Sequence, residues 1–283
     1  MSDIYVAIVV ILTLSTALTV GSYRISRRHK ATAITLATAA VLLLAVHVWQ
    51  WRDSLAFARF LPFSNLIILA EPTPPLVAIL IGVGIALLPG RTARRAVLLV
   101  PLGALCLWAA YGWLWSRPSD LHNHWTKGVC RQTSQATCTP AAAATLLAHH
   151  GIKTTEQEMA DLCLTTSKGT RAPGLYRGLK LKTAGGQLTV TPLRGTIEDL
   201  RDAVARHGPV ILTVQLRPDA GLDPRFHTEW GWVPGVHHHV VLFRFHQDGR
   251  LLEVGDPAVG REFWGVDALA ALWHGQAIQL RAR

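Results

Sequence analysis

The sequence predicts two structural parts, an all-α transmembrane region followed by a single α+β domain. Three observations support this prediction. First, 50% of the 283 residues are hydrophobic and only 16% are charged, whereas charged residues make up about 25% of an ordinary soluble domain. Second, the long apolar stretches all lie within residues 1–116. Third, residues 128–283 show helical patterns first and strand patterns later, which is the order of an α+β domain rather than of alternating β and α units.

Four apolar stretches in the first part predict four transmembrane helices. The hydrocarbon core of a bilayer is about 30 Å thick and needs about 20 apolar residues in a helix. Stretches at about 4–22, 31–50 and 96–115 reach this length directly, and the one at about 70–89 reaches it with part of the preceding segment. The first stretch follows Asp3 rather than basic residues, which favours a retained span over a cleaved signal peptide.

Basic residues predict the orientation of these spans, because cytoplasmic loops collect lysine and arginine. Clusters at 24–30 and 91–95 are separated by two expected spans and therefore share one side. The domain after the fourth span is then extracytoplasmic, and the chain is expected to be a multi-pass protein of the cytoplasmic (inner) membrane, with the lipid bilayer as a partner. The segment 57–70 is expected to be an interfacial helix or a re-entrant piece, since a fifth span would break this charge pattern.

The net charge of +10 does not indicate nucleic-acid binding. Residues 1–117 hold ten Lys and Arg against three Asp and Glu, whereas residues 118–283 hold eighteen against fifteen. The excess therefore lies mainly among the apolar stretches, where it reports membrane topology rather than a basic binding face. The sequence also has no G-x-x-x-x-G-K-[ST] motif, so neither nucleic acid nor ATP is an expected partner.

Residues 117–127 are expected to form a linker and residues 128–283 one domain. Gly151 ends the first predicted helix as a C′ residue, Thr196 caps the fourth, and Gly249 belongs to the turn of a predicted hairpin. The expected elements are, in order, helices at about 139–149, 155–163 and 173–184, a strand at 188–192, a helix at 197–207, strands at 209–216, 237–246 and 251–254, and a helix at 266–273.

Cys138 is the expected nucleophile of this domain. It stands at the start of an Ala-rich helix, with Pro140 in the first turn, where the missing N–H of proline is tolerated. The positive end of the helix dipole and the free amides there favour the thiolate, which is the form that attacks a carbonyl. Gln132 lies six residues upstream, and its side-chain amide can donate to the oxyanion of a tetrahedral intermediate together with the Cys138 N–H.

A thiol nucleophile needs a base, and the sequence offers His238. The run His237-His238-His239 begins a strand of the buried type, and Asp256 follows His238 by eighteen residues, just after the next strand. An antiparallel hairpin brings this carboxylate beside the imidazole, where it fixes the tautomer and stabilises the imidazolium. We therefore expect a triad of Cys138, His238 and Asp256, with Gln132 as the oxyanion donor.

These residues resemble the motifs of the C39 peptidase family, the papain-like, bacteriocin-processing domains of peptide-exporting ABC transporters. The resemblance covers about residues 128–275. It implies a papain-like fold, in which a helix carrying the Cys packs on an antiparallel sheet carrying the His and Asp, and cleavage of a leader peptide after a small-residue, often double-glycine, site. It implies the same catalytic roles as those given above. The matching segments are Gln132-x5-Cys138-x-Pro140-Ala141, His238-His239-Val240-Val241-Leu242 and Gly255-Asp256-Pro257-x-x-Gly260.

Three features depart from the family pattern. Thr137 and Thr139 flank the nucleophile where the family often has Asp and Gly, and His239 stands where an aromatic residue usually follows the catalytic His. The chain also carries no ATPase motif. Two other functions stay open beside a peptidase with a peptide or protein substrate: a cell-wall amidase or thiol acyltransferase of related fold, and a non-catalytic domain that docks a leader peptide.

Other residues carry expectations with open alternatives. Trp230 and Trp232, and His239 with them, either line the substrate groove or pack at its rim. Cys130 and Cys163 flank the nucleophile's helix and form either a disulfide in an oxidising compartment or two unrelated buried thiols. The His run lacks further ligands at the spacing that zinc needs, so no metal and no cofactor is expected.

Overall fold

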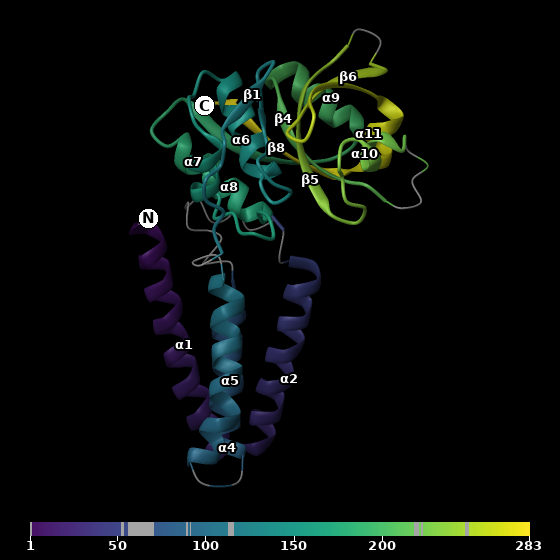
Figure 1. Cartoon of the computed structure of the whole chain (residues 1–283). Helices are drawn as coiled ribbons and strands as arrows, with labels where there is room; N and C mark the ends of the chain where they lie inside the picture. Colours follow the sequence, from purple (N-terminus) through teal and green to yellow (C-terminus); the bar gives the residue numbers. More distant parts are fainter. Residues whose placement is uncertain are drawn as a thin grey trace. The chain divides into compact units, whose positions relative to one another are not determined.

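The computed structural model of the chain describes residues 2–283 except 52–53, 56–70, 89, 91, 113–115, 218–220, 222 and 247–248. The chain divides into two compact units, Met1–Trp115 and Ser116–Arg283 (Figure 1). The expected interfacial or re-entrant segment at 57–70 lies outside the described residues.

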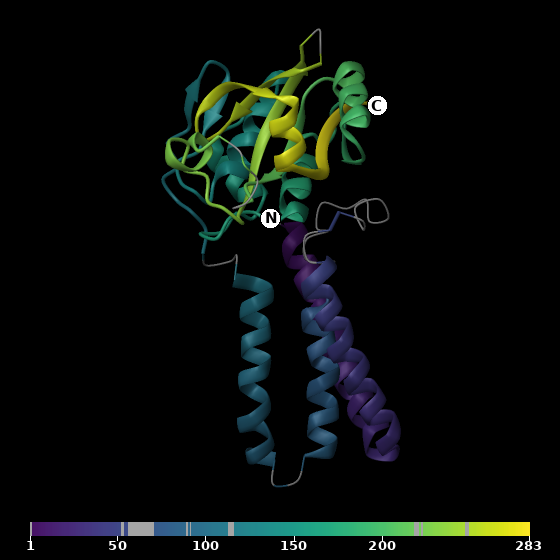
Figure 2. The same cartoon turned by 90° about the vertical axis from the view of Figure 1, so that its right-hand side faces the viewer.

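The described part of the N-terminal unit consists of four α-helices and one short π-helical turn. Figure 2 shows the helices running alongside one another. The π-helical turn continues the second helix without a break. The elements are α1 (Ser2–Arg28), α2 (Lys30–Val46), η1 (His47–Trp51), α4 (Thr73–Leu87) and α5 (Thr92–Tyr111).

Helix α4 packs against the other three helices of this unit. Gly82 allows its close approach to α1, because a Cβ at Gly82 would lie 2.0 Å from Ser22 Oγ. Nearby, the Thr19 hydroxyl donates to Ala78 O over 3.1 Å. Small and hydroxyl-bearing residues at a helix crossing are typical of helices that associate inside a membrane.

Two of the described helical stretches are long and apolar enough to cross a membrane, Ile4–Arg28 and Lys30–Trp51. The helix Thr73–Leu87 has 15 residues, and the apolar part of α5, Leu99–Trp108, is also shorter than a span. Each predicted stretch therefore contains a helix, but two rather than four of the helices within the described residues have the length of about 20 apolar residues that a span requires.

An antiparallel sheet forms the centre of the C-terminal unit. Its six strands, counted over the described residues, have the order β3-β8-β4-β5-β6-β7. A separate two-stranded ribbon of β1 and β2 precedes it in the chain. The strands are β1 (His124–Thr126), β2 (Val129–Arg131), β3 (Leu188–Arg194), β4 (Val210–Gln215), β5 (His237–Phe245), β6 (Leu251–Asp256), β7 (Gly260–Gly265) and β8 (Trp273–Ala282).

Helices cover both faces of this sheet. They are α6 (Cys138–His149), α7 (Glu156–Leu162) and α8 (Ala172–Lys182) on one side of β4 and β5, and α9 (Ile197–His207), α10 (Arg225–Thr228) and α11 (Val266–Leu272) on the other (Figure 1). Alternation along β5 explains the two faces. Val240 and Leu242 enter a buried core with Leu200 of α9 and Leu272 of α11, so Val241 points to the face on which α6 packs.

The helices and strands predicted for residues 139–273 are confirmed, each within two residues of its predicted ends. The predicted hairpin is confirmed as the antiparallel pair of β5 and β6. Strands β7 and β8 and the short helix α10 were not predicted. Strand β8 pairs with β3 on one side and with β4 on the other, so its place depends on partners distant in the chain.

The expected linker at 117–127 is corrected by the structure, because its last residues form β1. Thr126 pairs with Val129, and the two residues between them, Lys127 and Gly128, both have positive φ angles of 48° and 79°. Two central residues with φ above zero make the type I′ turn that closes tight hairpins. The preceding chain is anchored too, since Gln157 Nε2 of α7 donates to Pro118 O over 3.4 Å.

Candidate active site

Cys138, His238 and Asp256 come from three elements that meet at the sheet. Cys138 is the first residue of α6, which packs on β5 and β4. His238 is the second residue of β5 and Asp256 the last of β6, and these strands pair with Leu242 opposite Val254. Because side chains alternate along a strand, His238 shares the face of Leu242 and Asp256 shares the face of Val254. The register therefore directs the imidazole and the carboxylate to the same side.

His238 and Asp256 are joined by a hydrogen bond of 2.7 Å between Nε2 and Oδ1. Asp256 is fully buried, and it accepts two more hydrogen bonds, from Trp232 Nε1 to Oδ2 at 2.9 Å and from Ala258 N to Oδ1 at 2.8 Å. A buried carboxylate needs such donors to remain charged. Because the Asp256 carboxylate only accepts hydrogen bonds, Nε2 of His238 carries a proton, and Nδ1 is the ring nitrogen that this contact leaves available.

The Cys138 thiol lies against two imidazoles. Burial by itself would raise the pKa of this 6% exposed thiol, but its interactions with the rings of His238 and His239 hold the pKa well below its usual value. Burial opposes the imidazolium as well, yet the Asp256 carboxylate and the Cys138 sulfur raise the pKa of His238 to about 10. Both shifts favour the thiolate of Cys138 and the imidazolium of His238, which is the charge state that makes a cysteine reactive.

Cys130 and Cys163 behave in the opposite way. Both are buried free thiols, and burial raises the pKa of each to about 12. The disulfide considered for them is absent, because the Cys163 sulfur is directed at α8, where a Cβ on Gly178 would lie 2.3 Å from Sγ. Among the three thiols of this unit, Cys138 alone has the electrostatic environment of a nucleophile.

His239 is held between two threonine hydroxyls. Its Nδ1 lies 3.0 Å from Thr139 Oγ1 and its Nε2 lies 3.2 Å from Thr213 Oγ1. Thr139 Oγ1 is in turn 3.9 Å from Cys138 Sγ. The imidazole of His239 is buried between these hydroxyls rather than exposed to solvent. These two contacts could not be predicted from the sequence, because Thr139 and Thr213 lie 100 and 26 residues from His239 along the chain.

The two tryptophans before β5 have different surroundings. Trp232 is buried, its ring centroid is 4.5 Å from that of His238, and its indole N–H binds Asp256. Trp230 is partly exposed and packs edge-on against Phe226, with ring centroids 4.6 Å apart. Trp232 thus supports the carboxylate and the imidazole, whereas Trp230 lies nearer the surface of the same aromatic group.

Gln132 is tied to the turn that follows Asp256. Its backbone N–H donates to Pro257 O over 2.9 Å, so the segment leading to the nucleophile and the segment leaving the carboxylate are joined. Its side-chain Oε1 is buried and accepts no hydrogen bond from any residue that the structure describes. The N–H₂ group is the end of this amide that can serve an oxyanion, because only that group donates hydrogen bonds.

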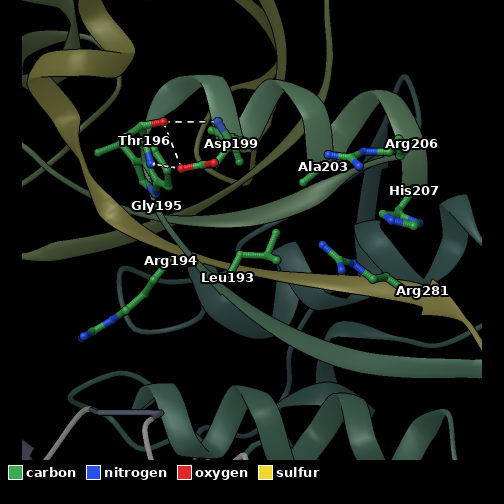
Figure 3. Close-up of a pocket in the computed structure, with 11 residues that line it drawn as sticks. Leu193, Arg194, Gly195, Thr196, Asp199, Ala203, Arg206, His207 and Arg281 are labelled. Atoms are coloured by element: carbon green, nitrogen blue, oxygen red, sulfur yellow. Dashed lines mark hydrogen bonds between the residues drawn. The ribbon is translucent and has the colours of Figure 1, made fainter.

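A cavity of about 290 Å³ lies elsewhere in this unit, between β3, α9 and β8 (Figure 3). Arg206, His207 and Arg281 line it, and the Asp199 carboxylate beside them is taken by the backbone N–H and hydroxyl of Thr196. None of the triad residues lines this cavity, so it is separate from the thiol centre. Across the residues that the structure describes, no group of three or more His, Cys, Asp and Glu side chains is arranged to hold a metal ion.

Comparison with protein families matches residues 127–273 to the model described as the Peptidase_C39-like family. One relative is an uncharacterized protein of Methanothermobacter marburgensis, which is 33% identical over 100 residues. That alignment covers 34% of this chain and 70% of the relative.

Solved structures with similar chains include two peptidase domains of transporters. The peptidase domain of Streptococcus ComA, a bifunctional ABC transporter of a quorum-sensing pathway, is 20% identical with a TM-score of 0.44, over 56% of this chain and 100% of that one. A double-glycine-motif protease from an AMS/PCAT transporter, solved with its leader peptide, is 18% identical with a TM-score of 0.41, over 55% of this chain and 91% of that one.

Proposed function

Because the chain belongs to the Peptidase_C39-like family, we propose that it is a cysteine peptidase in which Cys138 is the nucleophile, His238 the acid and base, Asp256 the orienting carboxylate and Gln132 an oxyanion donor. One observation supports this proposal more than any other. The thiol with the lowered pKa lies against the imidazole whose far nitrogen is bonded to a buried carboxylate. That set of groups is what nucleophilic attack on an amide requires.

The reaction runs through an acyl-enzyme. The Cys138 thiolate attacks the scissile carbonyl carbon, and the oxyanion accepts hydrogen bonds from the Cys138 N–H, which has no partner within its helix, and from the Gln132 amide. His238 gives its proton to the leaving amine, and the C–N bond breaks. The neutral His238 then takes a proton from water, the hydroxide attacks the thioester, and departure of the acid restores the thiolate and the imidazolium.

The proposed substrate is a peptide or protein with small residues at the cleavage site, and double-glycine leaders belong to this class. Cys138 is only 6% exposed, so a scissile carbonyl reaches the sulfur only where the substrate backbone is nearly bare. Glycine and alanine allow such an approach, because they place little or no side chain next to the backbone. This steric demand agrees with the leader-peptide cleavage that the family resemblance implies.

We also propose that the N-terminal helices anchor the peptidase in the cytoplasmic membrane as a multi-pass region, with the peptidase domain outside. Arg24, Arg27, Arg28 and Lys30 surround the junction of the two span-length helices, and such basic groups favour the cytoplasmic side. A C-terminal alkaline phosphatase fusion of the full chain tests this orientation. Active phosphatase and a dark C-terminal GFP fusion are expected, and the reverse pattern would place the domain inside.

The peptidase function is tested by N-terminal proteomics of cells that carry the full chain or its Cys138→Ala variant. New N-termini should appear in membrane or secreted proteins with the parent chain and should be missing with Cys138→Ala. Cys163→Ala is the matched control, because it removes a buried thiol that lies against α8 rather than against an imidazole. Identical N-termini in all three strains would remove the peptidase proposal and leave a docking domain.

A further inference from the structure

The proposed mechanism assigns no role to one buried imidazole near the Cys138 thiol, that of His239. His239 contacts the thiol from β5, as His238 does, but it has no carboxylate partner. Both of its ring nitrogens are instead bonded to hydroxyls, those of Thr139 and Thr213. Both hydrogen bonds stabilise the buried imidazole, because a buried ring nitrogen without a hydrogen bond would cost free energy of folding.

The hydroxyl of Thr139 connects this imidazole to the nucleophile. It lies 3.0 Å from His239 Nδ1 and 3.9 Å from Cys138 Sγ, and the second distance is within reach of an O–H···S contact. A hydroxyl has one proton to donate. If the Nδ1–H of His239 donates to the Thr139 oxygen, the Thr139 proton is free to point at the sulfur.

The same arrangement accounts for Thr213. A neutral imidazole protonated on Nδ1 has a bare Nε2, and the Thr213 hydroxyl lies 3.2 Å from that nitrogen, where it can donate. The bonds then run in one direction, from Thr213 to His239, from His239 to Thr139 and from Thr139 to the sulfur. Hydrogen bonds aligned in this way reinforce one another in a buried site.

We infer that His239 is a positioning residue for the peptidase reaction: acting through Thr139, it aims a hydroxyl proton at Cys138 Sγ and stabilises the thiolate before attack. The inference rests on the proposed function of Cys138. It assigns a role to two of the three residues at which this chain departs from the family pattern, Thr139 after the Cys and His239 after the His.

The ionisation of the Cys138 thiol can be used to measure the effect of the Thr139 and Thr213 hydroxyls, once the charged groups around the thiol are known. His238 and His239 face Cys138 from β5, and Asp256 of β6 acts through His238. Strand β4 contributes Thr213, which carries no charge. Glu262 of β7 also faces Asp256, and burial together with the Asp256 charge raises its pKa. Four further charged groups lie against other partners: Glu156 of α7 against Cys130, Arg177 of α8 against Cys163, Arg201 of α9 against Phe245, and His149 of α6 against His150 and Arg261.

The test is the pH dependence of Cys138 alkylation by iodoacetamide in the detergent-solubilised full chain, followed by mass spectrometry. The alkylation rate rises with pH as the thiol ionises, and we call this rise the acid limb of the profile. Thr139→Val and His239→Phe should each move the acid limb upward by about one pH unit, which means about tenfold less thiolate at any pH on it. Thr139→Ser keeps the hydroxyl and His239→Asn keeps an N–H near Nδ1, so both should restore the parent limb. An unchanged limb in Thr139→Val and His239→Phe would overturn the inference.

A matched control separates this effect from loss of packing. Thr145→Val changes a buried threonine of the same helix, whose hydroxyl donates to Ala141 O, and it should leave the alkylation limb in place. The parent profile distinguishes the two proposals. If the acid limb of the parent chain lies near the ordinary thiol pKa, the proposed function itself is contradicted. If the acid limb of the parent chain lies at low pH but Thr139→Val does not move it, only the role of His239 is contradicted.

Discussion

The Nε2 atom of His238 lies 2.7 Å from Asp256 Oδ1, and the carboxylate is fully buried. This contact fixes the tautomer of the imidazole and leaves its second nitrogen to Cys138. The hairpin of β5 and β6 sets the contact, because both residues project from the same face of the sheet. The chemistry proposed for the thiol depends on this pair, and the following predictions test the pair and the residues around it.

Asp256→Asn should lower kcat by about 10²-fold or more, because an amide at this position stabilises the wrong tautomer and no longer offsets the imidazolium charge. The measurement is steady-state cleavage of a substrate peptide by the full chain. Glu253→Gln is the control, since Glu253 is another buried carboxylate of β6, paired with Arg244 and Arg261 rather than with His238. Equal losses per folded molecule in both variants would speak against a special role of Asp256.

Trp232→Phe should destabilise the fold by about 1–3 kcal/mol, because it keeps a ring but removes the N–H that donates to the buried Asp256 Oδ2. The free energy of unfolding in urea measures this loss, and the cleavage rate should fall with it. Trp230→Phe serves for comparison, because Trp230 is partly exposed and makes its contact through the ring. A larger loss in Trp230→Phe than in Trp232→Phe would contradict the prediction.

Gln132→Ala should lower kcat by about 10²-fold to 10³-fold with little change in KM, since an oxyanion donor acts mainly in the transition state. The rate of Cys138 alkylation should stay near that of the parent chain, because iodoacetamide develops no oxyanion in this reaction. A parallel fall of cleavage and alkylation would instead mean that Gln132 supports the thiolate.

The pair of Cys138 and His238 also predicts a stability profile. The raised pKa of His238, about 10 against 6.5, stabilises the fold fully below pH 6.5, and this contribution is lost as the pH rises through about 10. The lowered pKa of Cys138 acts in the opposite sense, because its contribution is complete above the usual value of 9.0 and is lost as the pH falls through the lowered pKa. Between pH 6.5 and 9.0 the two slopes cancel.

The measurement is the free energy of unfolding of the parent chain minus that of a Cys138→Ala, His238→Asn double variant, taken from pH 5 to 11. We expect a plateau between about pH 6.5 and 9.0 and a decline on both sides. A steady slope between pH 6.5 and 9.0 would mean that the folded and unfolded pairs bind different numbers of protons in this range, which would contradict the two opposite pKa shifts.

The sequence predicted the elements whose signals are local. Thr196 and Asp199 form a capping box, and helix α9 begins where these two residues predict it. The contact of His238 with Asp256 could also be predicted, because a short hairpin leaves few ways to place the two residues.

Features set by distant partners could not be predicted. The contact of Thr139 with His239 joins residues 100 positions apart, and no periodicity records it. The direction of the Cys163 sulfur, which excludes the disulfide with Cys130, depends on the approach of Gly178. Hydropathy alone likewise does not show that the helix Thr73–Leu87 stops short of a full span.

The central claim is that Cys138 attacks the substrate carbonyl, and acid-quench mass spectrometry tests it most directly. The full chain is mixed with a peptide that it cleaves, quenched within milliseconds, and digested. We expect the peptide containing Cys138 to gain the mass of the N-terminal substrate fragment as a thioester that hydroxylamine removes. Cleavage that continues in Cys138→Ala, with no such adduct in the parent chain, would contradict the claim.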